Sequence, residues 1–245
     1  PYGGFPWIDL PMAANQNWYN AHNFYGDLAH LDAATLDDVR SFFRTFYAPN
    51  NAVLVVTGDF TADQAKAWIE KYFAEIPAGK LPPPVDLREP RQDKEKRTGR
   101  TDPLANRPAL GIAYHLPERL TPEWFAFGLI DRALAQGSDS LLFDEVVRKA
   151  GLTGGVDAGI NWGLGNMFDY SGPMLWTSSL IHDPAQTDAE ILAAFDSNIE
   201  RIRREPVTQE ELDRARTQIR SSLYDLVGSS TRFGLADLLA CFALF

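Results

Sequence analysis

The chain has 245 residues, of which 45% are hydrophobic and 12% aromatic, so it has enough apolar side chains for packed cores and does not resemble a disordered protein. Its formal net charge of −10 disfavours the basic face with which a nucleic-acid-binding protein neutralises phosphates. No apolar run approaches the roughly 18 residues of a membrane-spanning helix. We therefore predict no nucleic-acid partner and no membrane span.

The N-terminal 34 residues are aromatic and rich in turns but show no clear period, which predicts mostly irregular chain with some helix. Residue 1 is Pro, so the chain is expected to begin at a cut or processed edge. Thr35 is a good N-cap, and apolar residues then recur at helical spacing until Pro49 stops the helix.

A strand and a second helix are predicted next. Residues 53–56 are an unbroken run of Val and Leu, which is typical of a strand covered on both faces. Thr61 and Gln64 fit a capping box, and the helix that they begin ends at Pro77. Residues 80–108 then contain six prolines and many charges, which indicates a linker between domains.

In the rest of the chain, strands and helices are predicted to alternate less regularly. The elements expected are a strand over 109–115, a helix beginning at Thr121 and Pro122, a helix over 141–150 capped by Gly151, β-rich segments at 154–162 and 170–181, helices beginning at the capping boxes of Thr187 and Thr208, and a last apolar helix that contains Cys241 and runs to 245. Strands grouped in one block and helices in another indicate an α+β fold, with an antiparallel sheet flanked by helices.

The candidate metal ligands do not form a recognisable motif. His115 to Arg119 comes within one residue of the inverted zinc motif His-x-x-Glu-His, but Arg replaces the second His and Pro117 is unsuited to the required helix. His22, His30 and His182 lie at no metal-ligand spacing from one another. We therefore predict no metal-binding residue in this chain.

Other candidate sites have simpler interpretations. The acidic pairs Asp37–Asp38, Asp144–Glu145 and Glu210–Glu211 fall near the N-terminal turns of predicted helices, where the helix dipole favours negative charge. The glycines at 154–155 and 163–165 form neither a dinucleotide-binding nor a P-loop fingerprint, and no Gly-x-Ser-x-Gly elbow occurs. Cys241 lies in an apolar run and is predicted to be a buried, inert thiol. No catalytic and no cofactor-binding residue is predicted.

Three segments, at 47–60, 140–152 and 208–219, are similar in order and spacing to segments of the pitrilysin or insulinase (M16-like) family of zinc metallopeptidases. The most specific is Tyr47-Ala-Pro-Asn-Asn-Ala-Val-Leu-Val-Val-Thr-Gly-Asp-Phe60. The resemblance implies an antiparallel α+β domain of the metallopeptidase type. It further implies that residues 1–79 are the C-terminal part of a first, catalytic-type domain, 80–108 a linker, and 109–245 a second, non-catalytic domain that lacks its final strand and helix.

In that family two His and a distant Glu bind zinc, and a Glu inside the motif is the general base. By the family's layout these residues lie upstream of residue 1, so the resemblance implies zinc for the parent protein and no cofactor in this chain. The family also places an Arg and a Tyr from a second-domain strand near the substrate. The corresponding segment, 171–177, contains no Arg, and Tyr170 lacks such a partner.

The resemblance implies that the chain is the non-catalytic portion of a zinc-dependent metalloendopeptidase. It would shape a peptide substrate chamber, act beside a catalytic domain, and pair with a partner half or subunit. Alone it should not hydrolyse peptides. The alternative is that the parent is a catalytically inactive family member that acts as partner or scaffold. Residues 32–75 are further expected to dock on the second domain or to exchange between copies. The compartment stays open, with the bacterial periplasm as a working assumption.

Overall fold

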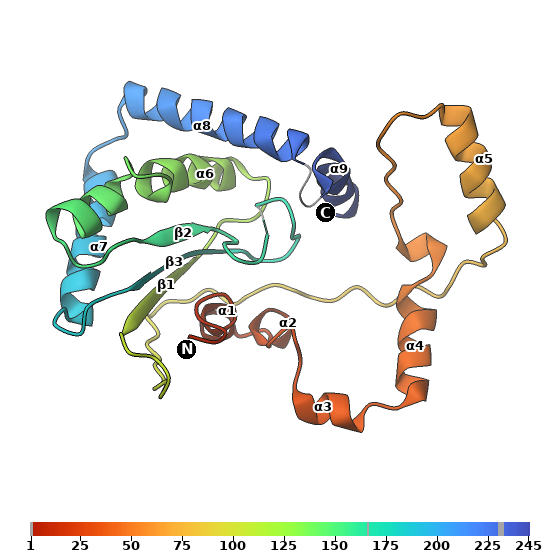
Figure 1. Cartoon of the computed structure of the whole chain (residues 1–245), viewed down its shortest axis with the longest axis horizontal. Helices are drawn as coiled ribbons and strands as arrows, with labels where there is room; N and C mark the ends of the chain where they lie inside the picture. The colour runs from red at the N-terminus through yellow and green to blue at the C-terminus, as the bar shows by residue number, and fades with distance from the viewer. Residues whose placement is uncertain (1, 166, 230–232) are drawn as a thin grey trace. The chain divides into compact units, whose positions relative to one another are not determined.

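A computed structural model describes the whole chain except residues 1, 166 and 230–232. The chain forms two compact units, which we describe separately (Figure 1). Unit 1 consists of Pro1–Phe24 and Leu87–Tyr224, and unit 2 of Tyr25–Asp86 and Asp225–Phe245. Residues 2–24 therefore pack with the later part of the chain in this structure. The assignment of 1–79, 80–108 and 109–245 to a first domain, a linker and a second domain stays a prediction.

Unit 1 is built on an antiparallel sheet, as the sequence predicts. Its strands are β1 (Ala109–His115), β2 (Asp157–Ile160) and β3 (Leu175–Ile181), in the order β1-β3-β2. Both β1 and β2 pair with β3 in antiparallel register. The predicted strand 109–115 is confirmed, whereas the β-rich segments are shorter than predicted. Asn161 to Leu164 form turns, and Pro173 offers no N–H to a ladder, so β3 begins only at Leu175.

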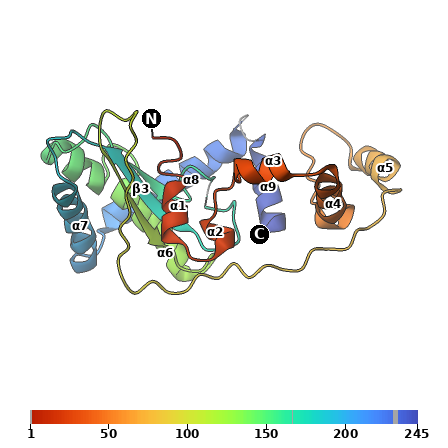
Figure 2. The ribbon, with the colours of Figure 1, turned by 90° about the horizontal axis from the view of Figure 1, so that it is seen from below.

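Helices lie on both faces of this sheet. They are α1 (Asp9–Ala14), α2 (Trp18–Ala21), α6 (Pro122–Ala135), the π-helix η2 (Phe143–Lys149), α7 (Asp188–Arg204) and α8 (Gln209–Gly228), of which the part to Tyr224 belongs to unit 1. Figure 1 shows α6 and α8 on one side of the sheet and α1 on the other, and in Figure 2 α1 lies against the strands with α2 next to it. We call the face that carries α1 the open face, because only short helices cover it.

The main core lies between the sheet and the longer helices. Trp176 on β3 is 1% exposed and packs against Phe195 on α7, with ring centroids 5.8 Å apart. Ile191 and Leu142 are also completely buried in this core. Each such side chain contributes about 1.5–3 kcal/mol through burial, so this layer dominates the stability of unit 1.

The predicted capping boxes begin the later helices. Thr187 Oγ1 accepts the backbone N–H of Glu190, and the Glu190 carboxylate accepts the backbone N–H of Thr187. Thr208 and Glu211 repeat this arrangement at the start of α8. The hydrogen bonds from the threonine backbone and hydroxyl lower the pKa of both glutamates. These local signals fix where α7 and α8 begin.

The helix predicted over 141–150 exists, but most of it is wound as the π-helix η2 rather than as an α-helix. Its C-terminal end shows the wider turn, because the backbone N–H of Ala150 donates to the carbonyl of Glu145. Val146 is fully buried by this winding. Gly151 follows with φ of +61°, which confirms it as the predicted capping glycine.

Unit 2 contains the helices α3 (Leu28–Ala33), α4 (Leu36–Phe46), η1 (Pro49–Asn51), α5 (Ala62–Phe73) and α9 (Leu235–Leu244). Thr35 forms a complete capping box with Asp38, and Thr61 accepts the backbone N–H of Gln64. The side-chain hydrogen bond from Thr35 lowers the pKa of Asp38. The predicted helix starts are therefore confirmed, and Cys241 on α9 is buried as predicted.

The strand predicted over 53–56 is wrong for this structure. These residues carry no strand assignment, and Leu54 is 57% exposed. The physical reason is the lack of a partner: the described residues of unit 2 contain helices and irregular chain but no strand with which a ladder could form. Over the described residues, no helix combines the length and apolar character that crossing a bilayer requires.

Candidate functional site

The segment that resembles a zinc motif does not have the helical geometry that the motif requires. His115 ends β1, and residues 116–121 form no helix, so His115 and Arg119 are not placed on one helical face. The His115 Nε2 lies 3.1 Å from Asn15 Oδ1, and burial lowers the pKa of His115. Arg119 Nη2 donates to the carbonyl of Phe168 at 3.3 Å. Both side chains therefore have structural partners.

The other histidines are not brought together. In unit 1, His22 stacks on Trp18 with ring centroids 4.4 Å apart, while His182 is 1% exposed with its Nε2 3.4 Å from Asp188 Oδ1. His30 lies on α3 in unit 2. Over residues 2–165, 167–229 and 233–245, neither unit by itself holds three His, Cys, Asp or Glu side chains that converge on one point. The described side chains thus do not fit the two-His, one-Glu site that the family resemblance implies for the parent.

Tyr170 lies beside the N-terminal residues and not beside an arginine clamp. Its hydroxyl donates to Asn20 Oδ1 at 2.7 Å, and burial raises the pKa of the phenol. The segment 171–177 supplies the first three residues of β3, of which Leu175 and Trp176 are buried. The arrangement holds the N-terminal residues to the body of unit 1.

A buried polar network in unit 1 was missed from the sequence. Asp131 on α6 is 7% exposed, and its Oδ1 accepts the indole N–H of Trp176 at 2.7 Å and the amide of Gln136 at 3.3 Å. Gln136 also donates to the carbonyl of Ala158 on β2 at 2.8 Å. Burial raises the pKa of Asp131, and the hydrogen bond from Trp176 opposes that rise. The sequence signal that could have revealed this network is an acidic residue in the middle of an otherwise apolar predicted helix.

The predicted acidic pairs have local partners. Asp144 and Glu145 both face Lys149, at 2.9 and 3.3 Å. Their hydrogen bonds raise the pKa of Lys149. Asp38 and Glu211 belong to capping boxes, as described above. Local structure therefore accounts for these acidic side chains, of which Glu211 also lines the depression described next.

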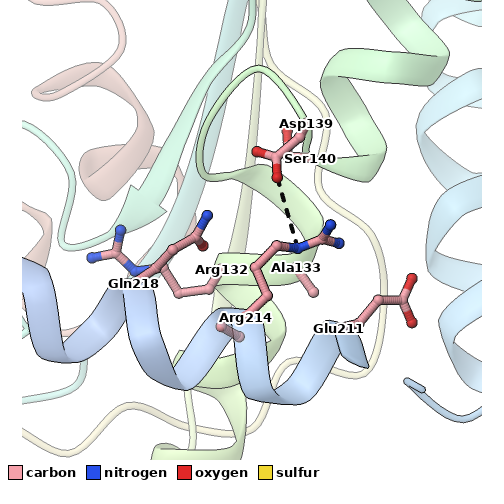
Figure 3. Close-up of a pocket in the computed structure, with 8 residues that line it drawn as sticks. Arg132, Ala133, Asp139, Ser140, Glu211, Arg214 and Gln218 are labelled. Atoms are coloured by element: carbon pink, nitrogen blue, oxygen red, sulfur yellow. Dashed lines mark ion pairs between the residues drawn. The ribbon is translucent and has the colours of Figure 1, made fainter. Parts of the chain in front are cut away.

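One surface depression lies between α6, the following loop and α8 (Figure 3). Figure 3 shows Arg214 reaching from α8 towards Asp139, with which it forms an ion pair at 3.7 Å, while Ser140 lies behind them. Glu211 is nearby and pairs with Arg201. The enclosed space holds about one water molecule. This depression is therefore a seam between two packed helices rather than a substrate site.

Comparisons with known proteins agree with the resemblance seen in the sequence. The model of a family described as the peptidase M16 inactive domain matches residues 33–219. A curated relative, the zinc protease PqqE of Helicobacter pylori, is 26% identical over 117 residues, which is 47% of this chain and 26% of that protein.

Solved structures show the same fold. A protease from Helicobacter pylori matches with a TM-score of 0.76 and 19% identity, over 89% of this chain and 51% of that one. A peptidase M16 inactive domain from Pseudomonas fluorescens matches with a TM-score of 0.73 and 22% identity, over 97% and 54%. A chain of complex III2 from Candida albicans matches with a TM-score of 0.77 and 16% identity, over 97% and 55%.

This chain thus spans about half the length of these solved structures and about a quarter of the curated relative. The family match nevertheless covers well over half of the chain itself, including all three segments that carry the resemblance. The predicted M16-like family and the α+β fold are confirmed. The chain belongs to the peptidase M16 inactive-domain family.

Proposed function

We propose that this chain is the non-catalytic portion of a zinc-dependent metalloendopeptidase. It forms part of the wall of a peptide chamber and pairs with a zinc-bearing domain and with a partner half or subunit. The observation that carries the proposal is the match of residues 33–219 to the M16 inactive domain. The dispersed histidines support it, because they leave the chemistry to residues outside this chain.

In this proposal the residues of this chain provide a rigid surface and take no part in the chemical step. In unit 1 the completely buried Trp124, Leu142 and Phe195 stabilise a layered body on which a peptide-facing surface can be held in place. Zinc, when bound to the parent, would supply the activated water, and no residue described here is assigned to that step. No nucleic-acid partner is proposed.

The test compares the full-length parent with the 245-residue chain. Both proteins are purified, zinc content is measured by elemental analysis, and hydrolysis of a quenched fluorescent peptide library is followed with and without a chelator. We expect one zinc and chelator-sensitive hydrolysis in the parent, and neither in the isolated chain. Hydrolysis by the isolated chain with a bound zinc would overturn the proposal. A parent without zinc and without activity would support the scaffold function instead.

A further inference from the structure

The carboxylate of Glu89 binds the residues that precede and begin α2. It accepts the backbone N–H of Gln16 at 2.7 Å and that of Asn17 at 3.0 Å, and the side-chain amide of Asn20 at 2.7 Å. These donors lie about 70 residues earlier in the chain. Hydrogen bonds to an ionised carboxylate are shorter and about twice as strong as neutral ones, so Glu89 is a strong tie between two distant segments.

Asn20 extends this tie in two directions. Its amide also donates to the carbonyl of Leu87 at 2.8 Å, while its Oδ1 accepts the hydroxyl of Tyr170 at 2.7 Å. Its backbone carbonyl accepts the amide of Asn15, whose Oδ1 contacts His115 at the end of β1. The tie is therefore anchored to the body of unit 1 and is not merely a contact between two loops.

The tie lies where the chain leaves and re-enters unit 1. The chain departs after Phe24 and returns at Leu87, so that residues 25–86 form an excursion into unit 2. Glu89 and Leu87 at the return point bind Asn17 and Asn20 just before the departure point. These bonds close the excursion at its base. We call this junction, residues 15–20 with 87–89, the neck.

Polar contacts also hold the N-terminal residues that cover the open face of the sheet. That face carries small residues: Gly111 on β1 faces Ser179 on β3, and Thr177 is two residues away. A Cβ at position 111 would lie 3.0 Å from both Leu10 and Phe5, so the N-terminal residues rest directly on the strand. The Thr177 hydroxyl beneath this face has no hydrogen-bond partner among the described residues. Small and polar residues offer little apolar area to hold the cover, so polar contacts hold it: Arg100 pairs with Asp9 at 3.0 Å, Lys96 donates to the carbonyl of Ala14 at 3.0 Å, and the neck holds residues 15–20.

We infer that Glu89 is the latch of the neck: it closes the 25–86 excursion and keeps residues 15–24 against the body of unit 1. Opening the latch frees the base of the excursion and residues 15–24, while Arg100 and Lys96 still hold Asp9 and Ala14 and the core on the other face of the sheet is left intact. The latch would work in the same way whether the parent is an active peptidase or a scaffold.

The test measures amide hydrogen exchange of the full chain by mass spectrometry in the wild type, Glu89→Ala and Glu89→Gln. In Glu89→Ala we expect exchange over residues 15–24 to be at least about tenfold faster, because the amides of Gln16 and Asn17 lose their acceptor. Glu89→Gln keeps one carbonyl acceptor and should show a smaller rise. Exchange in α7 should not change in either variant.

The matched control is Glu95→Gln, which removes a charge from the same segment at an exposed side chain that pairs with Arg97. Exchange over residues 15–24 should not change in this control. Unchanged exchange there in folded Glu89→Ala, or an equal rise in Glu95→Gln, would overturn the inference. If circular dichroism shows that Glu89→Ala does not fold, Asn20→Ala is measured instead, because it removes hydrogen bonds of the same neck. It should produce the same local rise in exchange. No rise in Asn20→Ala would refute the latch.

Discussion

Replacing the buried Asp131 by Asn should change how the stability of unit 1 depends on pH. Burial raises the pKa of Asp131 above its ordinary value of 3.8, although the hydrogen bonds from Trp176 and Gln136 oppose this rise. The folded state then binds more protons at this site than the unfolded state does. The stability that the protonated carboxyl contributes is fully present below pH 3.8 and is lost as pH rises through the folded pKa.

The size of the effect follows from linkage and from the geometry of the site. Within the window between the unfolded and folded pKa values, the stability of the wild type falls by at most about 1.4 kcal/mol per pH unit because of this one group. Asn keeps the shape and one carbonyl acceptor for the indole N–H of Trp176, so Asp131→Asn should cost less than about 1 kcal/mol at low pH. Asp131→Ala leaves that buried N–H unpaired and should cost about 1–3 kcal/mol more.

The assay is urea unfolding of the wild type and Asp131→Asn at a series of pH values from 3.5 to 8. The difference between the two free energies of unfolding is the informative quantity, because contributions from the capping carboxylates Asp38, Glu190 and Glu211, whose pKa values are lowered, cancel in it. We expect the variant to gain stability relative to the wild type as pH rises from 3.8. A difference that is flat, or that changes in the opposite direction, would contradict the assignment of Asp131 as a carboxyl whose ionisation is opposed by burial.

Three further substitutions test the packing and the caps. Phe195→Ala removes a ring that is completely buried against Trp176 and should cost about 3–5 kcal/mol in urea unfolding, whereas a cost below 1 kcal/mol would contradict this core. Thr187→Ala removes the cap of α7 and should cost about 1 kcal/mol, with Thr187→Ser as the control that restores the hydroxyl. Gly111→Val should displace the N-terminal residues, which is seen as faster hydrogen exchange over residues 2–14 with α7 unchanged; unchanged exchange over 2–14 would show that the segment does not rest on β1.

The features that could be predicted from the sequence are those set by a few neighbouring residues. Thr35, Thr187 and Thr208 each begin a helix at the predicted position, because a capping hydroxyl and its acceptor three residues later act locally. The strand over 109–115 was likewise predictable from an apolar run bounded by Pro and turn residues, whereas the antiparallel sheet was predicted from the grouping of the strands and from the family resemblance. Family membership adds to these signals but rests on the same segments.

The features that could not be predicted depend on partners far away in the chain. Trp176 lies 45 residues after Asp131, and no local pattern links an indole to a carboxyl at that distance. Glu89 lies in a charged, Pro-rich segment whose composition indicates a solvated linker. Its carboxylate nevertheless accepts hydrogen bonds from residues near Asn17. A side chain's role in such a network depends on the tertiary fold rather than on propensity.

For the run 53–56 the prediction failed because a distant partner is missing rather than because one is present. Val and Leu in succession favour an extended backbone, but a strand exists only when a second strand supplies the ladder, and composition carries no information about whether that strand is at hand. In unit 2 the flanking helices α4 and α5 form with their predicted caps, while Leu54 between them stays exposed. Helices close their hydrogen bonds within the segment and strands do not, which is why the helix predictions here succeeded and the strand prediction failed.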